Sequence, residues 1–115
     1  MTNPIAAWQI VTKEPDAVAQ FYSKLFGWKI TTSNALGYRE VKTGEAGIDG
    51  GIWPSPPGGA NIVQLFVGVA DVASCVKKAV ALGAKVIIPR TELPDGDVMA
   101  ILLDNAGISF GLKQS

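Results

Sequence analysis

The pattern of apolar and polar positions in the first half of the chain predicts a strand, a helix and three further strands. Residues 5–11 form a short apolar run with β-branched side chains, which is typical of a strand. Thr12 is a candidate N-cap for a helix with Pro15 in its first turn, and apolar residues follow at helical spacing until Gly27. The three further strands are predicted at 28–32, 38–43 and 48–53.

The second half repeats this order after a linker at 54–60 that is rich in proline and glycine. A strand is predicted at 62–69, and Asp71 is a plausible N-cap for a helix that ends at Gly83. Three strands are expected at 85–89, 97–103 and 108–113, with a loop at 91–96. The two halves match at an offset of about 56 residues, which indicates an internal repeat.

This repeat predicts the fold class, which is α+β. We expect two tandem βαβββ modules forming a curved mixed sheet around a cavity, with the helices on the outer face. The expected organisation is a single domain over residues 1–115, with module 1 at about 4–53 and module 2 at about 61–115. The modules can pair within one chain or swap between two chains. The cavity is the default ligand site.

Charge and cysteine content narrow the classes of partner and compartment. Ten basic and ten acidic residues cancel and are scattered, so we expect no nucleic-acid partner. No apolar run is long enough to span a membrane, and the N-terminus carries no secretory signal, so we expect no membrane partner. The single cysteine, Cys75, cannot form an internal disulfide, which favours a cytoplasmic protein. Cys75 lies on an apolar helical stripe and is interpreted as a buried, inert thiol.

The chain contains no histidine. This absence excludes Ser-His-Asp and Cys-His nucleophilic catalysis and every metal site that needs an imidazole ligand. A site made only of carboxylates could still hold Mg²⁺ or Ca²⁺. However, no acidic loop with the required spacing is present, and the segment 94–97 is typical of a turn.

Two sets of residues resemble a known family. Glu14 and Pro15, followed by the sequence FYSKLFGW at 21–28, resemble the motif of the vicinal-oxygen-chelate superfamily of glyoxalases, bleomycin-resistance proteins and extradiol dioxygenases. The segments 82–84 and 104–107 resemble features of the second module of that family. The likeness covers nearly the whole chain. Glu14 departs from the pattern because the family usually has Asp at this position.

The resemblance implies a divalent metal ion held by four side chains, mostly His, Glu or Gln, from the first and last strand of each module. Counting from the shared motifs places these positions at Ala7, Gly51, Gln64 and Gly111. Three of them have no side-chain donor, and one amide oxygen cannot hold a functional ion. We therefore expect no metal and no cofactor, and the glyoxalase or dioxygenase chemistry of the family is not supported.

If these four positions face the cavity, the two-residue period of a strand predicts which other side chains share that face. The predicted cavity residues are Ala7, Gln9, Glu40, Lys42, Asp49, Gly51, Trp53, Gln64, Phe66, Ser109 and Gly111. The residues predicted to pack on the helix side are Trp8, Ile10, Ile48, Ile52, Leu65, Val67, Val69, Ile108, Phe110 and Leu112.

Several of these residues have more than one interpretation. The charged strand residues can bind a polar ligand or simply face solvent. Trp53 can stack on a ligand, seal a subunit contact or pack within its own chain. The glycine pair at 50–51 permits close approach of a ligand or another backbone, or else marks a bulge. Phe21 and Tyr22 are interpreted mainly as core.

The leading hypothesis is a small-molecule-binding protein with a metal-free cavity, similar to bleomycin-resistance proteins that sequester a ligand. By the same resemblance we expect a homodimer. The alternative is a metal-independent isomerase, lyase or hydrolase in which Glu40 or Asp49 acts as general base, which requires a carboxyl group with a raised pKa. A third hypothesis is a partner-binding module that has kept the scaffold and lost its chemistry.

Overall fold

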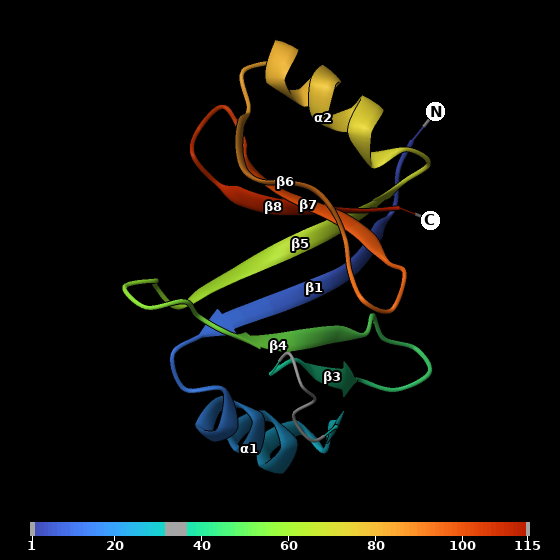
Figure 1. Cartoon of the computed structure of the whole chain (residues 1–115). Helices are drawn as coiled ribbons and strands as arrows, with labels where there is room; N and C mark the ends of the chain where they lie inside the picture. The colour runs from blue at the N-terminus through green and yellow to red at the C-terminus, as the bar shows by residue number, and fades with distance from the viewer. Residues whose placement is uncertain (1, 32–36, 115) are drawn as a thin grey trace. The chain divides into compact units, whose positions relative to one another are not determined.

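Within residues 2–31 and 37–114, which the computed structural model describes, two helices and eight strands follow the predicted order (Figure 1). The first half contains β1 (Ile5–Thr12), α1 (Pro15–Phe26), β2 (Lys29–Ile30), β3 (Arg39–Lys42) and β4 (Gly50–Pro54). The second half contains β5 (Ile62–Val69), α2 (Val72–Ala81), β6 (Lys85–Glu92), β7 (Val98–Leu103) and β8 (Ser109–Gln114).

The chain divides into an N-terminal unit, Ala7–Gln64, and a C-terminal unit made of Met1–Ala6 and Leu65–Ser115. The strand order in the N-terminal unit is β2-β3-β4-β1, and in the C-terminal unit it is β6-β7-β8-β5. In each unit the first and last strands pair in parallel, and the other pairs are antiparallel. The α+β class and the repeated βαβββ order are therefore confirmed. A cavity lined by both modules stays a prediction, as do the single-domain boundaries.

Helix α1 begins and ends through two different local devices. Pro15 stands in its first turn, where a missing backbone N–H costs nothing. The predicted N-cap, Thr12, is wrong: it is the buried last residue of β1, and Glu14 occupies the cap position. The Thr12 hydroxyl instead accepts a bond from the Glu14 backbone N at 3.1 Å. Gly27 ends the helix with φ of 72°, as expected for a C-terminal glycine.

Helix α2 is capped as predicted. The Asp71 side chain accepts a hydrogen bond from the backbone N of Ser74 at 3.1 Å. We expect Asp71→Ala to lower the free energy of unfolding by about 1 kcal/mol, because the first helical turn loses its acceptor. Asp71→Asn keeps that acceptor and should lose much less. Urea denaturation followed by circular dichroism distinguishes the two, and equal losses would show that the cap is not the cause.

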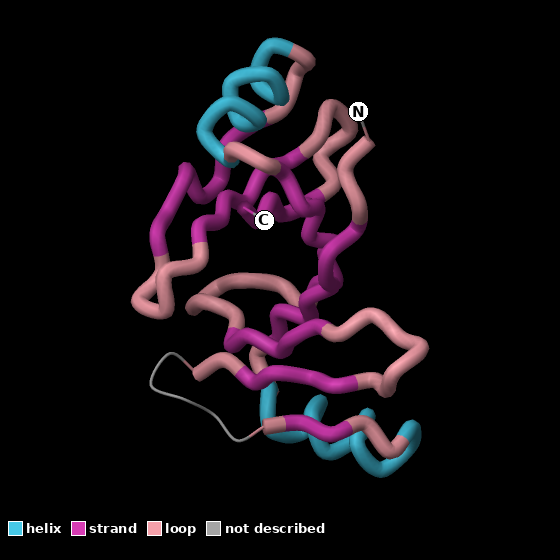
Figure 2. The backbone as a smooth tube through the Cα atoms, turned by 90° about the vertical axis from the view of Figure 1, so that its right-hand side faces the viewer, coloured by secondary structure: helices cyan, strands magenta, loops and turns pink. Residues whose placement is uncertain are grey.

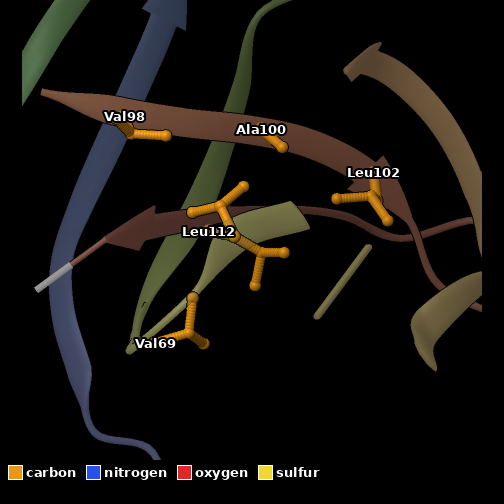
Figure 3. Packing of buried hydrophobic residues seen from close by; sticks show 6 residues of the cluster. Val69, Val98, Ala100, Leu102 and Leu112 are labelled. Atoms are coloured by element: carbon orange, nitrogen blue, oxygen red, sulfur yellow. The ribbon is translucent and has the colours of Figure 1, made fainter. Parts of the chain in front are cut away.

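In the C-terminal unit α2 lies over one face of the sheet (Figure 2), and a cluster of buried apolar side chains forms the core of this unit (Figure 3). Its buried members are Val69, Val72, Val98, Ala100, Leu102 and Leu112. Phe110 and the half-buried Cys75 pack against this cluster, as the strand alternation and the helical stripe indicate. Three helix-side assignments are wrong, because Ile108 is 64% exposed just before β8, and Leu65 and, in the N-terminal unit, Ile48 are each about half exposed.

In the N-terminal unit the buried apolar side chains are Val41 and Ile52, and a cluster of half-buried and exposed aromatic rings links β1 to α1. Trp8 of β1 lies 5.5 Å from Trp28, and Trp28 lies 5.4 Å from Tyr22 and 5.1 Å from Phe26, all measured between ring centroids. Trp8 therefore packs on the helix side, as predicted, and its Nε1 donates to the Ile48 carbonyl at 2.6 Å. Phe21 is not core: it is 57% exposed, because α1 turns the neighbouring Tyr22 toward the cluster instead.

The observed strand boundaries differ most from the predicted ones where the sequence contains proline or turn residues. The predicted turn after β2 falls mainly on 32–36, outside the described residues. The predicted loop at 91–96 is wrong at its start, because β6 continues to Glu92 through Pro89. β6 lies at the edge of its sheet and shows register shifts, and such positions tolerate proline because its missing N–H is not needed for pairing. Neither described helix is long and apolar enough to cross a membrane.

Candidate functional site

The face of the N-terminal sheet opposite α1 gathers most of the predicted cavity residues. Gly51 of β4 pairs with Gln9 of β1 on one side and with Glu40 of β3 on the other. Directly paired residues point to the same face of a sheet, so these three side-chain positions lie together. Arg39 and Val41, which flank Glu40 in β3, point to the opposite face and are buried on the α1 side.

An aromatic ring of the chain itself covers Gly51. A Cβ atom at Gly51 would lie 2.1 Å from Cε1 of Tyr38, so no side chain fits there without displacing the ring. The same ring lies against Trp53, with 4.7 Å between centroids. Gly51 is one of the positions at which the resemblance predicts a metal ligand. In this chain the Tyr38 ring packs against the backbone of Gly51, and Trp53 packs against that ring.

The neighbouring Gly50 has a different close contact. A Cβ at this position would lie 2.3 Å from the Trp8 ring and 2.5 Å from the Trp8 carbonyl oxygen, which belongs to the paired strand. The β1–β4 register runs without interruption through both glycines, so the interpretation as a bulge is wrong. Close approach is the reason for the glycine pair, and the approaching groups belong to the chain itself.

Tyr38 was not among the predicted site residues. It stands two positions before Glu40 and four before Lys42, so strand alternation alone could have placed it on the same face. The predicted strand at 38–43 includes this residue, but of that strand only Glu40 and Lys42 were assigned to the cavity.

The charged residues of this face form one small network. The Lys42 ammonium lies 2.9 Å from a carboxylate oxygen of Glu40 and 3.8 Å from one of Asp49. The hydrogen bond and charge of Glu40, followed by the charge of Asp49, raise the pKa of Lys42 above its usual range. Asp49 also accepts a bond from the Thr43 backbone N at 3.0 Å. Both proposed bases therefore already bind a cation, and their side chains are about half exposed.

Two amide side chains extend the face at β1 and the start of β5. Gln64 is buried and donates from Nε2 to Oε1 of Gln9 at 3.4 Å. Ala7, two residues before Gln9 in β1, is half-buried and its side chain is only a methyl group. These positions supply one amide pair to a ligand and no charge.

The remaining predicted cavity residues, Phe66, Ser109 and Gly111, lie in the C-terminal unit. There too an aromatic ring packs over a glycine. Gly111 of β8 pairs with Phe66 of β5, and a Cβ at Gly111 would lie 2.5 Å from two atoms of the Phe66 ring. Phe66 is only 4% exposed, so its ring has little room to move. Ser109 pairs with Leu103 and is half-buried.

The residues at the four family positions do not fit a divalent ion. Aromatic rings cover two of them, Gly51 and Gly111, one is an alanine, and one is a glutamine bonded to another glutamine. Throughout the part of the chain that the structure describes, no three residues among His, Cys, Asp and Glu come close enough to hold a metal.

The N-terminal unit also has an apolar groove of about 380 Å³ on its α1 side, which the sequence did not indicate. It is bordered by β1, α1 and the first residues of β5. Its lining includes Ile10, Val18, Phe21, Tyr22 and Val63. Because Phe21 and Val63 are strongly exposed, this groove leaves apolar surface in contact with solvent.

The sequence of this chain is similar to one known domain family and to two curated proteins. Residues 8–112 match the family model of the glyoxalase-like domain. The candidate glyoxylase CFP32 of Mycobacterium bovis and of Mycobacterium tuberculosis is 28% identical over 107 residues. That match takes in 90% of this chain but only 41% of the relative, so the chain spans less than half of the length of CFP32.

Two solved structures share the fold. Hypothetical protein BH1468 from Bacillus halodurans C-125 superposes with a TM-score of 0.73 at 13% identity, covering 100% of this chain and 96% of that one. A variant of methylmalonyl-CoA epimerase from Streptomyces coelicolor, in complex with 2-nitronate-propionyl-CoA, gives a TM-score of 0.68 at 18% identity. It covers 100% of this chain and 96% of the epimerase.

Proposed function

Since this chain belongs to the glyoxalase-like domain family, we propose that it binds a small molecule without the metal ion of that family and sequesters it, as bleomycin-resistance proteins do. The observation that carries this proposal is the covering of Gly51 by Tyr38 and of Gly111 by Phe66. Both positions, where a metal ligand would stand, are used for aromatic packing. The epimerase complex shows that a related fold accommodates a small organic molecule.

The N-terminal face favours a particular kind of ligand. The rings of Tyr38 and Trp53 offer a partly exposed aromatic surface, suited to a flat apolar group. The Gln9 amide and the Lys42 network lie on the same face and can bind polar atoms at the ligand's edge. We therefore propose a planar molecule with a polar rim.

A thermal-shift screen of planar metabolites and antibiotics tests this proposal. We expect a compound that raises the melting temperature of the wild type and binds Trp53→Ala about five- to ten-fold more weakly, because a stacked aromatic contact contributes about 1 kcal/mol. Gln64→Ala should also reduce the shift. Lys77→Ala, an exposed change on α2 of the C-terminal unit, is the control. Binding that survives Trp53→Ala unchanged would contradict the assignment.

The enzymatic alternative receives less support from the site. A general base needs a carboxylate able to take a proton, whereas Glu40 and Asp49 both lie against the Lys42 ammonium. We therefore keep ligand binding as the proposed function. We also place the protein in the cytoplasm, on the single cysteine, with no nucleic-acid or membrane partner.

We also propose a homodimer. Phe21, Leu25 and Phe26 of α1 are each more than half exposed, and Val63 of β5 is more exposed still. Apolar surface of this kind is typical of subunit contacts. Leu25→Glu should shift a dimer toward monomer in light scattering after size exclusion, whereas Lys24→Glu, beside it on the same helix, should not. A wild-type monomer at every concentration would overturn the proposal.

A further inference from the structure

A second groove of the N-terminal unit lies between α1 and the strands β2 and β3, on the side of the sheet opposite Glu40 and Lys42. Its volume is about 490 Å³. The polar side chains that line it are Asp16, Gln20, Ser23, Lys24, Thr31 and Arg39. Two of these are cationic and one is acidic, in a chain whose overall charge is zero.

Arg39 forms the buried part of this groove. Its side chain is 10% exposed, and it donates from Nη1 to the Gly37 carbonyl at 3.0 Å and from Nη2 to a carboxylate oxygen of Asp16. A guanidinium has five N–H donors, so three are left after these two bonds. Because Arg39 lines the groove, these three donors are the ones that a ligand in the groove would meet.

Asp16, the acidic partner of Arg39, is unusual in its exposure. Its side chain is 83% exposed, so the ion pair joins a buried cation to a carboxylate that water surrounds. Because Asp16 is this exposed, its carboxylate can move into water when another anion takes its place at the guanidinium. The exchange costs the charge-assisted hydrogen bond between Asp16 and Arg39, which the new anion replaces with its own.

We propose that this groove binds the anionic group, a carboxylate or a phosphate, of a small molecule. The planar fork of Arg39 matches the paired oxygens of such groups, and Lys24 adds a second positive charge. The Thr31 hydroxyl accepts a bond from the Glu40 backbone N at 2.9 Å, which leaves its own proton for an oxygen of the ligand. Asp16, as part of the same chain, competes with the ligand for the Arg39 guanidinium. This inference does not depend on the proposed function, because the groove lies on the other face of the sheet.

The test is a titration of the full chain with inorganic phosphate and, separately, with succinate, at ionic strength held constant with sodium chloride. Backbone amide shifts of Ser23, Lys24 and Thr31 report binding at the groove. Asp16→Asn should tighten binding about three- to five-fold, because the competing carboxylate is lost, and Lys24→Gln should weaken it by a similar factor. Lys29→Gln, an exposed lysine outside the lining, is the matched control and should change nothing.

The two arms identify the anion. A response to phosphate alone assigns a phosphate group, a response to succinate alone assigns a carboxylate, and either supports the site. The absence of a response to either anion would overturn the proposed site. So would an Asp16→Asn variant that binds no more tightly than wild type, or equal weakening by Lys24→Gln and Lys29→Gln, which would indicate only general charge screening.

Discussion

Gly50→Ala is expected to lower the free energy of unfolding of the N-terminal unit by about 3 kcal/mol. The added methyl would lie 2.3 Å from the Trp8 ring and 2.5 Å from the Trp8 carbonyl oxygen. The ring also packs at a tilt against Trp28, and the carbonyl belongs to the strand that pairs with β4, so neither can move without breaking other contacts. Urea denaturation followed by tryptophan fluorescence measures this loss directly, because all three tryptophans lie in this unit.

Gly68→Ala is the matched control for this change. Gly68 is also a buried strand glycine, but the nearest atoms to a Cβ there lie 3.6–3.9 Å away, at ordinary contact distance. We expect its free energy of unfolding, followed by circular dichroism, to change by less than about 1 kcal/mol. If Gly50→Ala were as harmless as Gly68→Ala, the packing of Trp8 described above would be wrong.

Gly111→Glu is expected to destabilise the C-terminal unit by about 3 kcal/mol without creating a metal site. The first atom of the new side chain would overlap the Phe66 ring, which is too buried to move aside, and the carboxylate would also lose its hydration. Thermal unfolding followed by circular dichroism, with and without Ni²⁺ or Zn²⁺, measures both effects.

The second variant in this test removes the ring. In a Phe66→Leu background, Gly111→Glu should cost less than it does alone, because the two positions are in contact. A Gly111→Glu protein that is as stable as the wild type and melts at a higher temperature with Ni²⁺ would contradict this account. It would show that the Phe66 ring does not prevent a side chain at position 111 from holding a metal ion.

Local sequence signals predicted the fold well. Gly27 and Asp71 mark the end of α1 and the start of α2, because both positions depend on backbone conformation or hydrogen bonds within a few residues. The repeat of βαβββ was visible for the same reason, since each element has its own periodicity. Thr12 was wrongly predicted as the N-cap because a β-branched threonine is equally suited to end a strand.

Long-range contacts could not be predicted in this way. The exposure of Phe21 and Ile108 depends on which neighbours reach them, and the helical or strand pattern does not contain that information. The same holds for the covered glycines. Alternation placed Gly51 and Gly111 on the expected face, but only the structure shows that Tyr38 and Phe66 lie against them.

The central claim is that this chain works without the metal ion of its family, and the most direct test measures the metal content and melting temperature of the purified protein before and after treatment with EDTA. The account predicts no stoichiometric divalent metal and an unchanged melting temperature after chelation. One tightly held divalent ion per chain, with a melting temperature that falls on chelation and recovers when the ion is returned, would contradict it.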